Sequence, residues 1–171
     1  MRHVIIDGYN VIRADPRLQS FERVSLEHAR DVLVRTLASS PRLVNDNVVV
    51  VFDGARGQRR HVHSHRMGRI DVLYSAQGQS ADDVIVHQAE ALAGRGPVVV
   101  VSNDVAVREA CRMHGCEVSG SENLLLQLPG QVRGRRRAED EDDAPRNLST
   151  EKRGNPRRAS RKDRRRRDYR F

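Results

Sequence analysis

Three continuous apolar runs constrain the fold of this chain more than any other feature of its sequence. They are His3–Ile6, Val48–Phe52 and Pro97–Val101. None of them alternates between apolar and polar residues, which is typical of strands that are buried on both faces of a parallel sheet. We therefore expect a parallel sheet with helices packed on both of its sides.

The segments between and after these runs have helical patterns. Apolar residues recur at helical spacing from Leu26 to Leu37 and predict a crossover helix over roughly residues 22–39. The stretch 80–83, SADD, has the form of an N-cap followed by an acidic N3 residue, and it predicts the start of a second helix. Further elements are expected as a strand at Ile70–Tyr74, a helix at Val105–His114, a strand at Glu117–Ser119 and a helix at Glu122–Leu128. This alternation predicts a doubly wound, three-layer α/β/α sandwich with a mostly parallel sheet.

Charge is distributed unevenly along the 171 residues. Residues 1–130 contain fifteen Arg and fifteen Asp or Glu, whereas residues 131–171 contain sixteen Lys or Arg and eight acids, which accounts for the net charge of +8. The second segment has almost no residues that could form a core, so it cannot bury enough apolar surface to offset the entropy of ordering. We predict one α/β domain over residues 1–130 and a disordered, Arg-rich tail over residues 131–171.

The cysteines and the apolar runs also bear on the compartment. Cys111 and Cys116 are too few for a disulfide scaffold and are wrongly spaced for a CxxC site, so we expect reduced thiols at a helix end. No apolar run approaches the roughly 18 to 20 residues needed to cross a bilayer, and the N-terminus lacks a signal-peptide core. A soluble, cytoplasmic protein with no membrane partner is the expectation.

Aspartates follow each of the three long strands that the sequence predicts. Asp7, Asp53 and Asp104 come after the first, second and third apolar run. Because the carboxyl ends of parallel strands meet at one edge of the sheet, these side chains are expected in the crevice where such sheets bind ligands. Asp82 and Asp83, at the start of a helix, can face the same edge.

Clustered carboxylates repel one another, and a hard divalent cation relieves that repulsion. Oxygen ligands of this kind suit Mg²⁺ or Mn²⁺. The chemistry that follows is hydrolysis of a phosphate ester. Two local alternatives stay open: Asp104 serves only as a helix cap, and Asp83 folds back as a capping partner of Ser80 and leaves Asp82 to the metal.

Several nucleotide-dependent chemistries lack the residues that they need. A phosphatase of the haloacid-dehalogenase type has a second Asp two positions after its nucleophile, where this chain has Tyr9. A P-loop requires GxxxxGK[ST] and a receiver domain requires a lysine, but the first lysine here is Lys152. GxGxxG is absent after the first strand, so we expect no nucleotide cofactor.

Four motifs occur in an order that resembles a known family: DGYN at 7–10, VVFDG at 50–54, SADD at 80–83 and SND at 102–104. Together they look like the NYN domain of the PIN-like nuclease superfamily, most closely its YacP-like branch. The resemblance covers about residues 1–130 and leaves the tail outside. It implies a PIN-like α/β/α fold and a Mg²⁺- or Mn²⁺-dependent nuclease, with RNA as the favoured substrate and ribosome-associated endoribonucleases among its relatives.

The same resemblance implies roles for individual residues. Asp7, Asp82 and Asp104 fall where the family has its metal-binding acids. Asn10 matches the asparagine of the first motif and would position a water or a phosphate. Asp53 is a weaker match to a family position and would support the metal ligands.

A basic segment follows Asp53. Between Gly54 and Ile70 the chain has no acid but has five arginines and three histidines, which are Arg56, Arg59, Arg60, Arg66, Arg69, His61, His63 and His65. We expect this segment to lie over the acidic crevice and to contact RNA phosphates on either side of the cut. The histidines alternate and would share one face of an extended chain. A zinc site and a solvated loop are the alternatives.

The sequence therefore predicts a metal-dependent endoribonuclease. Its expected catalytic residues are Asp7, Asn10, Asp82 and Asp104, and its expected metal ligands are Asp7, Asp82, Asp104, Asp53 and Asp83. The tail would add RNA affinity that falls with salt. The alternatives are an RNA- or ribosome-binding adaptor with a residual acidic site, and a structure-specific DNA nuclease.

Overall fold

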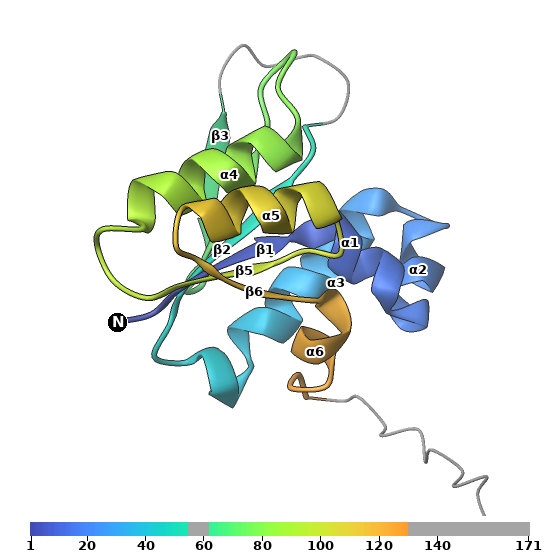
Figure 1. Ribbon diagram of the computed structural model, residues 1–171. Helices are drawn as coiled ribbons and strands as arrows, with labels where there is room; N and C mark the ends of the chain where they lie inside the picture. Colours follow the sequence, from blue (N-terminus) through green and yellow to red (C-terminus); the bar gives the residue numbers. More distant parts are fainter. Residues whose placement is uncertain (55–61, 130–171) are drawn as a thin grey trace, which may run out of the picture. The chain divides into compact units, whose positions relative to one another are not determined.

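The computed structural model describes residues 1–54 and 62–129, and these residues form a six-stranded sheet in the order β3-β4-β2-β1-β5-β6 (Figure 1). The strands are β1 (His3–Asp7), β2 (Asn47–Phe52), β3 (His63–Met67), β4 (Ile70–Tyr74), β5 (Val98–Val101) and β6 (Glu117–Ser119). All neighbours pair in parallel except β3, which is antiparallel to β4 at one edge. The predicted mostly parallel α/β fold is therefore confirmed.

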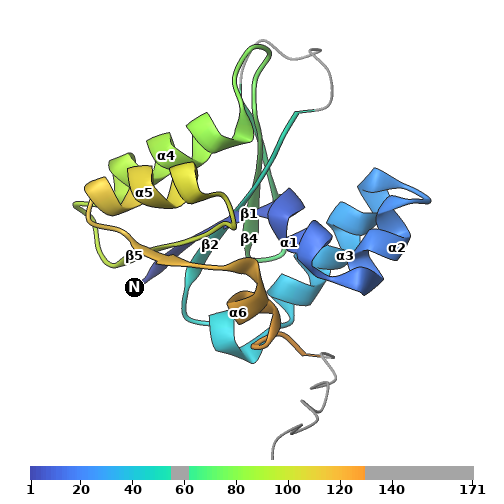
Figure 2. The same cartoon turned by 45° about the vertical axis from the view of Figure 1, so that its right-hand side comes forward.

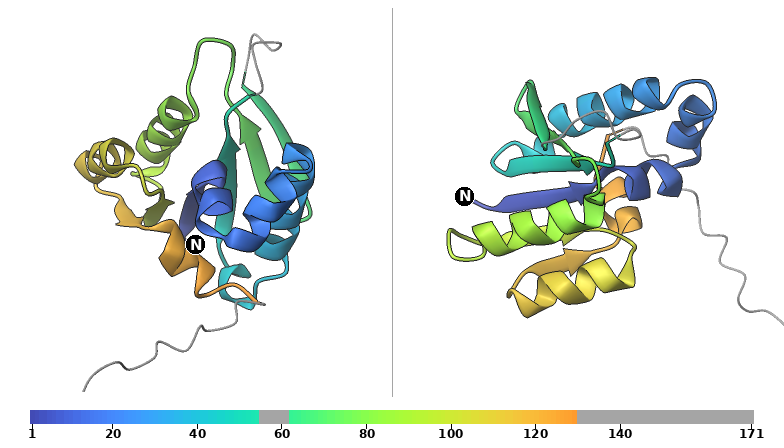
Figure 3. Two further views of the ribbon diagram at one scale, coloured as in Figure 1. Left: turned by 90° about the vertical axis from the view of Figure 1, so that its right-hand side faces the viewer. Right: turned by 90° about the horizontal axis from the view of Figure 1, so that it is seen from above.

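Helices cover both faces of this sheet, as Figures 2 and 3 show. They are α1 (Gly8–Ala14), α2 (Pro16–Glu22), α3 (Leu26–Ala38), α4 (Ala81–Leu92), α5 (Val105–Met113) and α6 (Ser121–Leu125), with a 3-10 turn η1 (Pro41–Leu43). Helices α1, α2, α3 and α6 pack on one face, and α4 and α5 pack on the other. In the part of the chain that the structure describes, no helix is long and apolar enough to cross a membrane.

The central strands are apolar throughout because successive side chains enter different cores. Ile6 and Val50 pack with Leu33 of α3, whereas their neighbours Ile5 and Val51 pack on the opposite face with Ile85 of α4. Adjacent residues of a strand point to opposite faces, so a strand between two helical layers needs apolar residues at every position. This is the physical reason for the continuous runs in the sequence.

The crossover after β1 contains more helix than the sequence pattern predicts. The expected helix over residues 22–39 is α3, Leu26–Ala38, but α1 and α2 precede it. Asp15 is the N-cap of α2, its side chain accepts from the backbone N–H of Arg17, and Pro16 occupies the first turn. An Asp-Pro pair is a helix start signal, and the two short helices are missed because each is only 7 residues long.

Part of the basic segment is a strand, which the sequence pattern did not predict. His63–Met67 forms β3, which returns as β4 through a tight turn with Gly68 at a positive φ of 63°. Such a φ favours glycine because it has no Cβ. Arg56, Arg59, Arg60 and His61 lie outside the described residues, as does the segment 131–171, so the expectations for them stay predictions.

The two cysteines are free and buried, as expected for reduced thiols. Cys111 lies in α5 and Cys116 follows that helix. Burial raises the pKa of the Cys111 thiol to about 11, so it stays protonated at neutral pH and behaves as a small apolar side chain.

Candidate active site

The carboxyl edge of the sheet gathers the aspartates of the strand ends. Asp7 is the last residue of β1, Asp53 directly follows β2, and Asp104 follows β5 after two residues. Since β2, β1 and β5 are parallel neighbours, these three positions share one edge. The N-terminus of α4 brings Asp82 to the same place. This proximity is evident from the pKa of Asp82, which burial and then the charges of Asp7, Asp104 and Asp53 raise.

Asp7 is buried and is held by hydrogen bonds from two residues. Only 5% of it is exposed. Its Oδ1 accepts from the backbone N–H of Asn10 at 3.1 Å, which makes Asp7 the N-cap of α1. Its Oδ2 accepts from the Asn10 side-chain amide and from the Ser102 hydroxyl at 3.2 Å. The start of α1 therefore fixes the orientation of this carboxylate.

Ser102 connects the first and third strand ends, and the sequence analysis did not single it out. It is fully buried just after β5. Its hydroxyl donates to Asp7, accepts from the amide of Asn10 at 3.2 Å, and accepts from the backbone N–H of Asp104 at 3.1 Å. The signal was available, since Ser102 opens the SND motif, but only the tertiary structure places it beside Asp7.

Asn10 has a positioning role in this network. Its side-chain nitrogen donates to Asp7 and to Ser102. The amide nitrogen is thus engaged by the protein, which leaves the amide oxygen as the group that can accept from a water or face a cation. The expected contact of Asn10 with water or phosphate stays a prediction, and its geometry favours water over phosphate.

Asp104 is the N-cap of α5. Its Oδ1 accepts from the backbone N–H groups of Ala106 at 2.7 Å and Val107 at 3.2 Å. This is the capping role that the sequence left open, and it uses one oxygen only. Among the described residues no donor contacts Oδ2, so capping leaves an oxygen that can serve as a ligand.

Asp82 and Asp83 are neighbours in the chain but have opposite environments. Partial burial, followed by the negative charges of Asp7, Asp104, Asp83 and Asp53, raises the pKa of Asp82. Asp83 instead closes a capping box: its Oδ2 accepts from the Ser80 hydroxyl at 2.7 Å and from the Ser80 backbone N–H at 3.0 Å. These bonds lower the pKa of Asp83. As the sequence suggested, Asp83 serves the helix and Asp82 is left to the acidic edge.

Asp53 is attached to the strand beside it. Its Oδ1 accepts from the Ser75 hydroxyl at 2.7 Å, and that hydroxyl accepts from the backbone N–H of Gly54 at 2.9 Å. A Cβ at Gly54 would lie 2.2 Å from the Ser75 carbonyl oxygen, so only glycine fits there. Asp53 is exposed and lies at the β2 end of the acidic edge.

The sequence model of the YacP-like NYN domain matches residues 4–167. The chain belongs to the YacP-like NYN domain family. NYN domains are part of the PIN-like nuclease superfamily, so the resemblance of the four motifs is confirmed. The resemblance was expected to cover about residues 1–130 only. The match corrects this extent, because it continues past residue 130 and includes most of the Arg-rich segment.

Relatives of known sequence or structure come from Bacillus subtilis. The protein YacP of strain 168 is 34% identical over 91 residues, which are 52% of this chain and 52% of that relative. The matched segment thus spans about half the length of YacP. Two crystal structures of Rae1 (YacP), one of them a point mutant, share the fold with TM-scores of 0.62 and 0.61 at 29% and 28% identity. They cover 74% of this chain and 74% and 72% of theirs.

Nucleases of the superfamily generally use divalent metals. The acidic edge fits such an ion if the ion keeps part of its water shell. In residues 1–54 and 62–129 no group of three or more His, Cys, Asp or Glu side chains is arranged closely enough to hold a metal ion by itself. The residues therefore do not form a closed, all-protein cage. Mg²⁺ retains several waters and needs only one or two carboxylates. Burial, followed by the charges of Asp7, Asp104, Asp83 and Asp53, raises the pKa of Asp82, and a bound cation would relieve this repulsion.

The basic residues of this NYN domain separate into two groups. His63, His65 and Arg66 lie on the edge strand β3, and His63 and His65 share one face, as the alternation predicted. Arg66 is 67% exposed at its side chain and contacts Asp71 at 3.7 Å. These three residues are accessible to a ligand.

Arg69 belongs to the other group, because the fold engages its guanidinium. It donates to four backbone carbonyls at the end of α3 and at η1, those of Ala38, Leu43, Leu37 and Ser40. Carbonyls at a helix C-terminus lack intrahelical partners, and a guanidinium can satisfy several of them. We therefore withdraw Arg69 from the residues expected to contact RNA and assign it to the hairpin turn.

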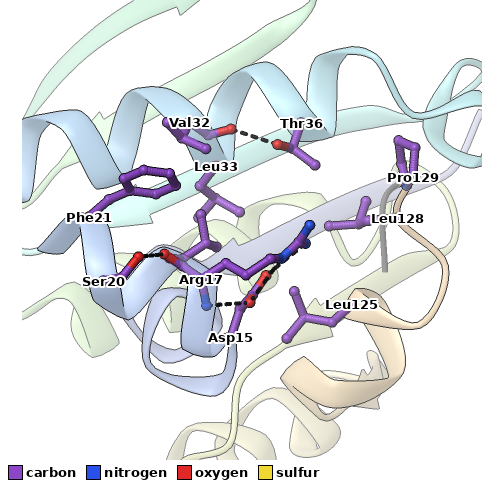
Figure 4. Close-up of a pocket in the computed structure, with 11 residues that line it drawn as sticks. Asp15, Arg17, Ser20, Phe21, Val32, Leu33, Thr36, Leu125, Leu128 and Pro129 are labelled. Atoms are coloured by element: carbon purple, nitrogen blue, oxygen red, sulfur yellow. Dashed lines mark hydrogen bonds and ion pairs between the residues drawn. The ribbon is translucent and has the colours of Figure 1, made fainter. Parts of the chain in front are cut away.

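An apolar pocket of about 350 Å³ lies elsewhere on the domain, between α2, α3 and α6 (Figure 4). Leu33 and Phe21 line it from one side and Leu125 and Leu128 from the other. Its polar members are paired, since Asp15 accepts from the side chain of Arg17 at 3.1 Å. None of the strand-end aspartates lines this pocket, so it is separate from the acidic edge.

Proposed function

We propose that this protein is a metal-dependent endoribonuclease that hydrolyses RNA phosphodiester bonds. One observation carries the proposal: in the described part of the chain, Asp7, Asp53, Asp82 and Asp104 share the carboxyl edge and none of them forms an ion pair with Arg, Lys or His. A fold does not concentrate uncompensated charge without cost. A cation brought by the ligand or the solvent is the natural partner for this edge.

The residues have distinct roles in this proposal. Asp7, Asp82 and Asp104 would hold Mg²⁺ or Mn²⁺ together with the waters that the ion retains, and Asp53 would support them from the β2 end of the edge. Bound there, the ion would supply a water of lowered pKa and would screen the charge that develops on the phosphate. Asn10 and Ser102 are positioning residues, because their hydrogen bonds fix the Asp7 carboxylate. Asp83 is left out of the proposed ligand set, since its Oδ2 is engaged by Ser80.

RNA would approach over β3 and the segment before it. His63, His65 and Arg66 are accessible on β3, and Arg56, Arg59, Arg60 and His61 precede it in the sequence. The Arg-rich segment 131–171 would add affinity through counterion release. We further propose that the protein acts in the cytoplasm and that a ribosome presents its substrate.

A second function has one observation in its favour. The absence of a ready three-residue coordination shell among the described residues is what a non-catalytic RNA- or ribosome-binding adaptor would have. Against it, a pure RNA binder gains nothing from a cluster of carboxylates beside phosphate, because the charges repel. We therefore rank the nuclease first.

The deciding experiment is cleavage of a mixed-sequence single-stranded RNA with Mn²⁺, Mg²⁺ or EDTA. Wild type is compared with Asp7→Asn, Asp82→Asn and the control Glu90→Gln, which changes an exposed carboxylate on the same helix as Asp82. We expect metal-dependent cutting that the first two substitutions abolish and the control retains. Tight, salt-sensitive RNA binding with no cutting, even with ribosomes added, would favour the adaptor. Faster cutting of matched DNA would indicate a DNA nuclease.

A further inference from the structure

A row of aromatic rings crosses three strands at the carboxyl edge of the sheet, on the face that α1 and α3 cover. Phe52 of β2 is the register partner of Tyr74 of β4, which in turn is the partner of His63 of β3. The ring centroids of Phe52 and Tyr74 are 5.8 Å apart, and those of Tyr74 and His63 are 6.4 Å apart, with interplanar angles of 28° and 26°. The three rings thus lie side by side in nearly parallel planes.

The row changes from buried to accessible along its length. Phe52 is 0% exposed and belongs to the core. Tyr74 and His63 are half-buried, and His65, two residues further along β3, is exposed. The His65 ring is 5.8 Å from Tyr74 at an interplanar angle of 14°, and 6.1 Å from His63. The accessible end of the row is therefore a group of stacked rings at the edge of the sheet.

Arg30 of α3 adds a positive charge to the same surface. Its guanidinium carbon is 5.3 Å from the ring centroid of Tyr9, 5.4 Å from that of Tyr74 and 5.6 Å from that of Phe52. Its Nε donates to the Tyr9 hydroxyl at 2.8 Å. Within the described residues it has no ion-pair partner, so its charge is held in place by aromatic rings and is available to an anion.

The row also begins next to the acidic edge. Phe52 directly precedes Asp53. Its ring packs against Gly8, which directly follows Asp7, so closely that a Cβ at Gly8 would lie 2.2 Å from it. Neighbouring strands are about 4.8 Å apart. Tyr74 and His63, two and three strands from Asp7, therefore lie on the order of 10 to 14 Å from it. The rings lie on the α1 and α3 face of the sheet and Asp82 starts α4 on the other face, so a ligand would contact both by passing over the carboxyl ends of β2 and β4.

We propose that Tyr74, His63 and His65, with Arg30, form a stacking platform that binds an unpaired base of RNA beside the site of cleavage. Aromatic side chains bind single-stranded nucleic acid by stacking on base faces, and an arginine beside them binds the backbone phosphate. Bases within a duplex already stack on each other, so the platform selects single-stranded RNA. Burial raises the pKa of Tyr74 and of Tyr9, so both phenols stay neutral beside phosphate. This inference rests on the proposed action on RNA.

The test uses a short single-stranded RNA that carries 2-aminopurine, whose fluorescence falls when it stacks. The chain has no Trp, so the signal is free of protein background in that range. Binding is measured with EDTA present, so that the RNA stays intact, for wild type, His65→Ala and the double variant His63→Ala with His65→Ala. The control is His87→Ala, which removes an exposed histidine from α4 on the opposite face of the sheet.

We expect quenching in wild type and in His87→Ala. In the double histidine variant we expect loss of quenching and about 10-fold weaker affinity, with an unchanged far-ultraviolet spectrum. A duplex of the same sequence should bind more weakly than the single strand. Unchanged quenching and affinity in the double variant, or equal affinity for the duplex, would overturn the platform.

Cleavage is scored separately with Mn²⁺, which distinguishes this inference from the proposed function. Quenching that depends on His63 and His65 in a protein that cuts no RNA would support the platform and reject the nuclease. If wild type cuts RNA, but quenching and affinity are unchanged when both histidines are replaced, the platform is rejected and the nuclease is supported. Absence of any RNA binding by wild type would overturn both.

Discussion

The two halves of the carboxyl edge are built in different ways. In the acidic half, at β1, β5 and the start of α4, several carboxylates are held by residues two or three positions away: Asp7 by Asn10, Asp83 by Ser80, and Asp104 by Ala106 and Val107. Ser102, which is distant in the sequence, also contacts Asp7. In the aromatic half, at β2, β4 and β3, the side chains contact partners that are far apart in the sequence, as Phe52 contacts Tyr74. The first half consists of carboxylates that repel one another, whereas the second consists of packed rings with Arg30 beside them.

This difference predicts which property each half controls. Repulsion among carboxylates lowers stability and is relieved by a bound cation, so changes in the acidic half should alter activity and leave the fold intact. Packed rings contribute to the core, so changes in the buried part of the aromatic half should lower stability. The following predictions test that division, from the largest effect to the smallest.

Asp82 and Asp83 give a matched pair within the acidic half. Asp82→Asn should lower the RNA cleavage rate by at least about 100-fold, since even the outer partners of metal ligands cost 10 to 100-fold when they are removed. Asp83→Asn should change the rate by less than about 3-fold, because its carboxylate serves the capping box. Rates are compared at saturating Mn²⁺. Equal losses in both variants would mean that Asp83 is a ligand and that the two aspartates have been assigned the wrong roles.

Arg69→Ala should cost about 3 kcal/mol of the free energy of unfolding, because a partly buried set of charged hydrogen bonds to four carbonyls is lost. RNA affinity, measured well below the melting temperature, should be unchanged. Arg66→Ala gives the contrast: it removes an exposed arginine from the same hairpin, so it should lower RNA affinity and leave stability unchanged. Urea unfolding gives the first quantity and filter binding gives the second. A loss of affinity with normal stability would restore Arg69 to the RNA-binding residues.

Gly8 is the point at which the two halves meet. A Cβ at this position would lie 2.2 Å from the buried ring of Phe52, so the ring or α1 has to move. Gly8→Ala should therefore lower the free energy of unfolding by about 2 kcal/mol, as overpacking of a core does. Thermal unfolding in the presence and absence of Mn²⁺ measures this. A variant as stable as wild type would show that the aromatic half is loosely packed at its inner end.

The smallest effect concerns Asp82 and pH. The folded state raises the pKa of Asp82 above its ordinary value of 3.8, so the folded protein binds this proton more tightly than the unfolded chain does. The stability that this provides is present below about pH 3.8 and is lost as the pH rises through the folded pKa. At neutral pH the ionised side chain destabilises the fold.

Asp82→Asn should consequently raise the free energy of unfolding at pH 7 and low salt by about 0.5 kcal/mol, a small gain because solvent screens this exposed side chain. The gain should shrink towards pH 4 and at high salt. Urea unfolding at both pH values measures it, with Glu90→Gln as the control. A variant that is less stable than wild type at pH 7 would contradict the repulsion between Asp82 and the other carboxylates of the acidic half.

Much of the fold follows from patterns that are local in the sequence. The runs His3–Ile6, Val48–Phe52 and Pro97–Val101 correspond to β1, β2 and β5, and the capping box at Ser80 starts α4 where it was expected. Two short helices were missed because a 7-residue helix shows barely two turns of periodicity. β3 was missed because a strand made of His, Ser, Arg and Met has no apolar alternation.

By itself, the sequence determined the strands, the layers and the acidic edge, because strand burial and helix capping depend on residues within a few positions of each other. It could not place Ser102 against Asp7, assign Arg69 to four carbonyls, or align Phe52, Tyr74 and His63 in one row. Those contacts depend on strand order and register, which are set when residues distant in the chain pack together. The tertiary structure therefore decided which polar and aromatic residues share a surface and which of them serve only the fold.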